Sequence, residues 1–278
     1  NDRQLVELLE VKEKIKITRE KLGLLLRKNG FSPKHKRRKK QYRSRRDRKA
    51  NFGAMIQMDA SSHDWLEGRG PKMNLVGGID DATSYAWARF EETENTWGYL
   101  RVLQEIITKE GVPLSIYTDR HTLFHSPKEP SIIEQFQNIR SLTQVGRACR
   151  DLGIEMIKAY SPQAKGRIER LWGTFQDRLV VELRLAKVSN REEANIFLKG
   201  YLKRHNQRFG VKAKARESVF RKGPSLGNIE RTLCLKEIRT VKKDHTISFE
   251  GLQLQIPPSS KWASIANQKV EVLQLENG

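Results

Sequence analysis

The sequence has little cysteine and no long apolar stretch. Only Cys149 and Cys234 occur in 278 residues, far apart and without a C-x-x-C pair. This excludes a disulfide-rich secreted fold and a structural zinc site with the usual ligand spacing, and it fits a reduced intracellular compartment. No segment approaches the roughly 20 apolar residues that span a bilayer. An apolar fraction of 37% nevertheless predicts a globular protein with a real core.

Acidic residues are also in short supply: 33 Asp and Glu stand against 53 Lys and Arg, a formal net charge of +20. The electric field of such a positive charge attracts polyanions, so nucleic acid is the expected partner class. An anionic membrane surface is the rival explanation, but no hydrophobic amphipathic anchor accompanies the charge. Residues 34–49 contain eleven Lys or Arg and one Asp. We expect this basic arm (31–51) to track DNA phosphates, with a solubility tail or localisation signal as the alternative.

Residues 1–30 predict two short helices, each with an apolar stripe. The first stripe is Leu5, Leu8, Leu9 and Val11, and the second is Leu22, Leu24, Leu25 and Leu26. Thr18 suits the N-cap of the second helix, and Gly30 suits its end. The pair is expected to form part of a helix-turn-helix with 19–29 as recognition helix, although an ordinary helical pair with a solvated basic face fits equally well. The expected solvent-facing cations are Arg19, Lys21, Arg27 and Lys28.

Residues 52–222 predict an α/β core, a mixed sheet with helices packed on it. The expected strands are 55–59, 73–79, 85–90, 114–118 and 154–159. The expected helices are 95–110, a helical region within 131–151, 166–186 and 191–207, with Asn190 as the N-cap of the last.

The C-terminal residues predict a linker at 223–236 and a small β unit at 237–278. HTISF and LQLQI flank the turn Glu250-Gly251, and KVEVLQL supplies another alternating strand. The chain begins at Asn1 rather than Met, and Asn277-Gly278 is a hairpin-turn pair with no strand behind it. We therefore expect an internal fragment of a longer protein, with a truncated β unit.

Three acidic residues suggest chemistry. Asp59 and Asp119 each end a short apolar run, MIQMD and SIYTD, and Glu169 opens an amphipathic helix. If the two strands are parallel neighbours, both aspartates emerge at the same edge of the sheet. Three carboxylates on separate elements of a basic chain suggest a divalent metal acting on phosphodiesters.

Other residues compete for this role. Asp64, Asp80 and Asp81 also lie near apolar segments, and an aspartate after a strand is more often a turn residue than a ligand. We expect Asp80-Asp81 to form a tight turn between the second and third strands. His63 and His121 are possible assistants, but a lone histidine is more often structural.

The order strand-Asp, three-strand meander, strand-Asp and P-x-x-K-G-R-x-E opening a helix resembles the integrase core of DDE transposases and retroviral integrases. SPQAKGRIERLWGTFQDRL is the strongest match, and the stretches QMDASSHDWLEGRGPKMNLVGGIDDAT and IYTDR further resemble bacterial insertion-sequence transposases. A helix-turn-helix before the core and a small β-barrel after it are also that family's organisation. The gap between Asp119 and Glu169 is longer than in retroviral integrases, which suggests an insertion within HTLFHSPKEPSIIEQFQNIRSLTQ.

The resemblance implies an RNase H-like fold in which Asp59, Asp119 and Glu169 are catalytic and bind two Mg²⁺ or Mn²⁺ ions. It implies 3′-end cleavage at an element end followed by strand transfer, on double-stranded DNA, by a homodimer or higher multimer in the bacterial cytoplasm, associated with the nucleoid. With the arm and the N-terminal helices, the expected DNA-binding residues are Arg19, Lys21, Arg27, Lys28, Arg37, Arg38, Lys39, Arg43, Arg45, Arg46, Lys165, Arg167 and Arg170.

Two other functions compete with transposition. A repurposed transposase acting as a DNA-binding regulator would keep the basic surface without turnover. A structure-specific nuclease on the same fold would cleave DNA but would not join it. Strand-transfer products would separate the nuclease from a transposase.

Overall fold

The computed structural model describes residues 2–31, 46–126, 142–159, 166–259 and 264–276. Its centre is a five-stranded mixed sheet of order β3-β2-β1-β4-β5. β1 (Ile56–His63), β2 (Met73–Asp80) and β3 (Ala86–Glu91) form an antiparallel meander, while β4 (Ser115–Thr118) runs parallel to β1 and β5 (Glu155–Lys158) runs parallel to β4. This order and these directions make the fold RNase H-like, as the sequence predicts.

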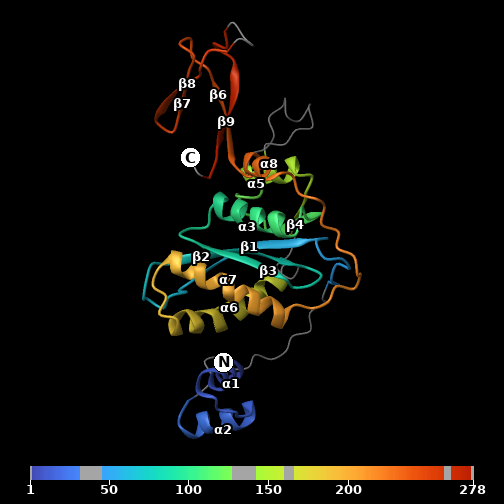
Figure 1. The fold of residues 1–278 in the computed structure, drawn as a ribbon, viewed down its shortest axis with the longest axis vertical. Helices are drawn as coiled ribbons and strands as arrows, with labels where there is room; N and C mark the ends of the chain where they lie inside the picture. The colour runs from blue at the N-terminus through green and yellow to red at the C-terminus, as the bar shows by residue number, and fades with distance from the viewer. Residues whose placement is uncertain (1, 32–45, 127–141, 160–165, 260–263, 277–278) are drawn as a thin grey trace.

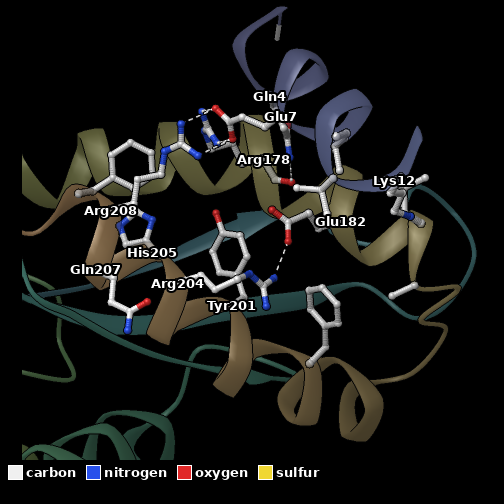
Figure 2. Close-up of a pocket in the computed structure, with 16 residues that line it drawn as sticks. Gln4, Glu7, Lys12, Arg178, Glu182, Tyr201, Arg204, His205, Gln207 and Arg208 are labelled. Atoms are coloured by element: carbon white, nitrogen blue, oxygen red, sulfur yellow. Dashed lines mark hydrogen bonds and ion pairs between the residues drawn. The ribbon is translucent and has the colours of Figure 1, made fainter. Parts of the chain in front are cut away.

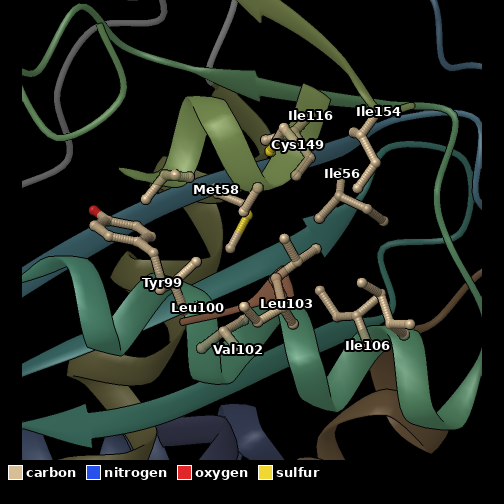
Figure 3. Packing of buried hydrophobic residues seen from close by; sticks show 14 of the residues in the cluster. Ile56, Met58, Tyr99, Leu100, Val102, Leu103, Ile106, Ile116, Cys149 and Ile154 are labelled. Atoms are coloured by element: carbon tan, nitrogen blue, oxygen red, sulfur yellow. The ribbon is translucent and has the colours of Figure 1, made fainter. Parts of the chain in front are cut away.

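Helices cover both faces of the sheet (Figure 1). α3 (Thr96–Lys109) and α5 (Gln144–Asp151) lie on one face, and α6 (Gly166–Leu185) and α7 (Arg191–Phe209) lie on the other. Because side chains alternate along a strand, the even-numbered residues Ile56 and Met58 of β1 pack against α3. Figure 3 shows this core, in which both residues are fully buried. The odd-numbered residues of β1 are left to face α6.

The predicted core elements lie close to the observed ones, with one informative difference. The first strand was expected to end at Asp59, but β1 continues to His63. Its second half, Ala60–His63, pairs only with β2, because the shorter β4 stops at Thr118. Asp59 therefore lies within β1, at the level where β4 ends. Of the helical region expected within 131–151, the described part is α5; residues 127–141 lie outside the described residues.

Two helices precede the core, α1 (Asp2–Glu13) and α2 (Arg19–Lys28). The Thr18 side chain caps α2 by accepting from the Lys21 amide, and Gly30 follows the helix with a φ of +81°, as the sequence predicts. The expected apolar stripe is only partly buried, because Leu24 is 62% exposed and Leu25 45% exposed. Both helices lie beyond α6 and α7, on the side away from α3 (Figure 1).

The C-terminal strands lie at the opposite end of the molecule, beyond α5 (Figure 1). β6 (Leu235–Thr240) pairs with β9 (Lys269–Gln274), and β7 (Thr246–Phe249) pairs with β8 (Leu252–Gln255). The β7–β8 turn is Glu250-Gly251, both with positive φ, as a tight hairpin requires. Within the residues described here the strands form two separate two-stranded ladders rather than the expected small β-barrel. A single small apolar cluster around Val241 and Ile247 joins them.

The expected linker 223–236 contains a short helix, α8 (Leu226–Thr232). Its Ile229 and Leu233 are buried in the same core as α3 and α5, which attaches this segment to the sheet domain. Both cysteines are buried free thiols. Over the described ranges, the model has no helix whose length and apolarity would suffice to cross a membrane.

Candidate active site

Helix α6 is aligned along β1 by three polar contacts at regular intervals. The Gln57 Oε1 accepts from the Ile168 amide at 3.3 Å, the Asp59 Oδ2 accepts from Trp172 Nε1 at 3.2 Å, and Gln176 Nε2 donates to Ser61 Oγ at 3.1 Å. Four helical residues rise about 6 Å and two strand residues rise about 6.6 Å, so steps of four on α6 match steps of two on β1. The contacts fix the register of the helix against the strand.

Gly77 makes room for the central contact. It pairs with Asp59 across the β1–β2 ladder, and a Cβ at this position would lie 2.9 Å from the Trp172 ring and 2.5 Å from the Trp87 carbonyl oxygen. A side chain here would therefore push Trp172 away from Asp59.

Asp59 and Asp119 are brought to the same level of the sheet. Ile56 pairs with Ile116 and Gln57 with Tyr117, and continuing this parallel register places Asp59 level with Asp119. Both carboxylates are half-buried. The negative charges of both aspartates act on the buried phenol of Tyr99. Burial, the hydrogen bond to Glu94 and the charges of Glu94, Asp59 and Asp119 all raise the pKa of Tyr99. The two aspartates lie at the same level, as the sequence predicts, although Asp59 lies within β1 rather than at its end.

Histidines lie beside Asp119. Its Oδ1 accepts from the His121 amide at 3.0 Å, which holds the turn after β4. His125 Nε2 lies 3.2 Å from Thr118 Oγ1, and burial and the charge of Lys158 lower the pKa of His125. His63, the other histidine considered from sequence, is exposed and packs edge-on against Trp65.

Glu169 lies in the first turn of α6 and is exposed, one residue beyond the Ile168–Gln57 contact. Its neighbours Ile168 and Trp172 are buried, whereas Glu169, Arg170 and Asp177 are all exposed. The three acids supply hard oxygen donors that suit Mg²⁺ or Mn²⁺. In the described part of the chain, however, no three Asp, Glu, His or Cys side chains are gathered closely enough to hold a metal ion.

Asp80 and Asp81, considered from sequence as turn residues, are both fully buried. Asp80 accepts from the amides of Gly53 and Thr83 and from the Thr83 hydroxyl, at 2.7 to 3.0 Å. Burial raises the pKa of Asp80, and these hydrogen bonds offset only part of that effect.

The Asp81 carboxylate accepts four hydrogen bonds, which no pattern in the sequence predicted. Its Oδ1 accepts from Gln57 Nε2 at 2.9 Å, from Arg167 Nη1 at 2.8 Å and from Arg46, and its Oδ2 accepts from the Lys49 amide at 2.7 Å. The signal that could have found it is a buried aspartate after a strand in a chain rich in arginine.

The basic residues predicted to bind DNA fall into three groups. On α2, Arg19, Lys21, Arg27 and Lys28 are all exposed. Arg46 and Arg167 are held by Asp81, whereas Arg170 is exposed. The remaining predicted contacts lie outside the described residues: Arg37, Arg38, Lys39, Arg43, Arg45 and Lys165.

A cavity of about 750 Å³ lies between α1 and the α6–α7 pair, on a different surface (Figure 2). Gln4 donates to the Arg178 carbonyl, and Glu7 pairs with Arg178 and Arg208. Burial raises the pKa of Glu7, but the bonds and charges of the two arginines outweigh it and lower that pKa overall. None of the three acids lines this cavity. It lies where α1 packs against α6 and α7.

Comparisons with known proteins point to one class. The chain is 40% identical over 210 residues to the transposase for insertion sequence IS1202 of Streptococcus pneumoniae, a match that covers 74% of this chain and 43% of that protein. It is 31% identical over 265 residues to y4bF of Sinorhizobium fredii, a protein named as a transposase, covering 94% of this chain and 56% of that protein. The chain is thus similar in sequence to proteins named as insertion-sequence transposases. It spans about half the length of the curated relatives it matches, and no protein-family model matches it.

Solved structures similar to this chain include retroviral integrases. The catalytic core domain of BIV integrase matches at 19% identity with a TM-score of 0.39, covering 58% of this chain and 88% of that one. The HTLV-2 integrase catalytic core domain in complex with magnesium, in a trimeric form, matches at 18% identity with a TM-score of 0.41, covering 56% and 87%.

Proposed function

We propose that this chain is the catalytic part of a DNA transposase that cleaves the 3′ ends of an insertion sequence and joins them to target DNA in a metal-dependent reaction. The observation that carries the proposal is the juxtaposition of Asp59 and Asp119 by the β1–β4 register, with Glu169 on the helix that Trp172 attaches to Asp59. The similarity to named insertion-sequence transposases supports the same class.

In this proposal Asp59, Asp119 and Glu169 together hold Mg²⁺ or Mn²⁺. Bound there, two such ions would activate the attacking oxygen and stabilise the leaving oxygen of an in-line displacement at phosphorus. The chain's own residues set the geometry. The β-sheet fixes the two aspartates, and the three β1–α6 contacts fix the turn that carries Glu169.

The nucleophile in this mechanism is first water and then the freed 3′-hydroxyl, so no protein nucleophile is needed. The basic arm and α2 supply phosphate contacts that position the duplex without reading its sequence. Assembly as a dimer or higher multimer on paired ends is part of the proposal. The trimeric and dimeric forms named for HTLV-2 integrase cores are properties of those proteins.

A second candidate function is a DNA-binding regulator derived from a transposase. The observation that favours it is the set of exposed basic residues on α2: Arg19, Lys21, Arg27 and Lys28. Such a protein would keep the basic arm and the helical pair but would not turn over DNA.

The test uses the full-length protein and a duplex that carries the end of its own element, with Mg²⁺, Mn²⁺ or EDTA. Nicked and joined strands are separated on a denaturing gel for the wild type and for Glu169→Gln, with Glu230→Gln, an exposed glutamate of α8, as the matched control. The proposal expects metal-dependent nicking and joining that only Glu169→Gln abolishes. Tight, salt-sensitive binding without cleavage under any metal would favour the regulator, and nicking without joining would favour a nuclease.

A further inference from the structure

The Asp81 carboxylate accepts hydrogen bonds from four residues, and the proposed chemistry gives it no role. We infer that Asp81 is a positioning residue that fixes the first turn of α6, and with it Glu169, to the strand that carries Asp59, and that ties the same turn to the end of the basic arm. The inference rests on the proposed function for the role of Glu169. The contacts of Asp81 themselves are independent of it.

The first connection runs through Gln57. This fully buried side chain lies on β1, two residues before Asp59. A carboxylate only accepts hydrogen bonds, so Asp81 requires the amide nitrogen of Gln57 to face it. The amide oxygen is then turned to the Ile168 amide, which lies in the first helical turn, where backbone donors lack partners within the helix. Asp81 thus selects the orientation of Gln57 that holds α6.

The second connection runs through Arg167, which directly precedes Ile168. Its Nη1 donates to Asp81 at 2.8 Å, and its side chain is only 11% exposed. Burial lowers the pKa of Arg167, and the cations Arg46, Arg48 and Arg170 lower it further, while Asp81 raises it. Without the aspartate, like charges would crowd around the helix start.

The third connection reaches the arm. The last residues of the basic arm contact Asp81 directly. Arg46 and the Lys49 amide both donate to the Asp81 carboxylate. Arg48 Nη1 donates to the Asp81 and Ala82 carbonyls at 3.2 Å and to Ser84 Oγ at 2.9 Å. Arg167 Nη2 closes the loop by donating to the Arg46 carbonyl at 3.2 Å. A duplex held by the arm is therefore mechanically connected to the turn that presents Glu169.

The test compares Asp81→Asn with Asp177→Asn, which removes the same charge from an exposed position on α6. Amide hydrogen exchange is followed in peptides covering 166–172 and 96–109, alongside DNA binding and end nicking. Asp81→Asn is expected to speed exchange at 166–172 and leave 96–109 protected. It should lower nicking on the order of 100-fold, because a displacement of about 1 Å has that effect on catalysis. DNA binding should be equal or tighter, since the substitution removes a negative charge from among cations.

Unchanged exchange at 166–172 in a folded Asp81→Asn variant would overturn the inference. If 96–109 also exchanges freely, the Asp81→Asn variant has unfolded. Amide exchange at 166–172 is then measured in Arg167→Met, and unchanged exchange there would likewise overturn the inference. This variant leaves Asp81 its bonds to Gln57 and Lys49. A wild type that never nicks DNA would refute the proposed function, and the exchange comparison would still decide whether Asp81 positions α6.

Discussion

Two pairs of aspartates lie close to β1, and their surroundings are opposite. Asp59 and Asp119 are half-buried, whereas Asp80 and Asp81 are fully buried. The buried pair accepts hydrogen bonds from backbone amides, a threonine, a glutamine and two arginines. In the function proposed above, the first pair binds the metal ion. The hydrogen bonds of the second pair to backbone and side chains around β1 give it a structural role.

The largest expected effect is on cleavage by Asp119→Asn. A neutral amide at this position weakens metal binding at the site proposed above, so nicking of an element-end duplex should fall on the order of 1,000-fold, equivalent to several kcal/mol of transition-state stabilisation. DNA affinity and unfolding by urea should stay at wild-type values, because Asp119 is not in the buried network. Nicking at wild-type rate would remove Asp119 from the proposed site.

Asp80→Ala should show the reverse pattern, a loss of stability rather than of chemistry. The amides of Gly53 and Thr83 would lose their acceptor in the interior. Unsatisfied buried donors lead us to expect a loss of about 3 kcal/mol in the free energy of unfolding. Urea unfolding at pH 7 measures it, with the exposed Asp64→Ala as control. A loss no larger than that of the control would contradict the structural role of Asp80.

His205 is a buried titratable base on α7, and burial determines its charge as it does for Asp80. Burial, together with the charge of Arg178, lowers its pKa from 6.5 to about 4, and its Nδ1 has no hydrogen-bond partner among the described residues. The unfolded chain therefore binds more protons between these values, so this contribution to stability is complete above pH 6.5 and is lost as the pH falls toward 4.

Replacing His205 with phenylalanine should remove that dependence. Between pH 7 and pH 4 the wild type should lose about 3 kcal/mol more unfolding free energy than His205→Phe. Urea unfolding across this pH range compares the two proteins. Parallel pH profiles would show that His205 is not buried in its neutral form.

Gly77→Ala tests how Asp59 is held. The added methyl would meet Trp172 and the Trp87 carbonyl, so we expect a loss of about 2 kcal/mol in stability from overpacking. The Trp172–Asp59 hydrogen bond should also break, so nicking should fall together with stability. Gly173→Ala, on α6 where a Cβ would meet no atom within 4 Å, is the control. Equal behaviour of both variants would argue against close packing at Gly77.

The smallest effect per residue concerns the arm. Replacing Arg37, Arg38, Arg43 and Arg45 by glutamine should reduce the slope of log K against log salt by about 0.9 for each phosphate that the arm no longer neutralises. Titrations of a labelled duplex between 50 and 200 mM salt, roughly the range over which such contacts weaken, give the slope. An unchanged slope would leave the arm without a DNA-binding role.

Much of the core was predictable because alternation and helical periodicity report burial directly. The strands around Asp59 and Asp119, the helix that begins at Gly166 and the Asn190 cap are all close to their predicted places. The hairpin at Glu250-Gly251 was predictable because two alternating runs, HTISF and LQLQI, flank a glycine that accepts the positive φ of the turn.

The Asp81 network was not predictable, because its partners are separated by 24 to 86 residues and no local pattern encodes such contacts. For the same reason the first strand was expected to end at Asp59. Its continuation to His63 depends on pairing with β2. The exposed leucines of α2 show that an apolar stripe indicates burial only where a neighbouring surface is present to cover it.

The contrast between the two pairs is tested most directly by measuring Asp119→Asn and Asp80→Ala in parallel for metal-dependent nicking and for urea unfolding. The account predicts that Asp119→Asn is as stable as the wild type and inactive, and that Asp80→Ala is destabilised but nicks DNA whenever it is folded. A stable, inactive Asp80→Ala beside an active Asp119→Asn would reverse the assignment and contradict the account.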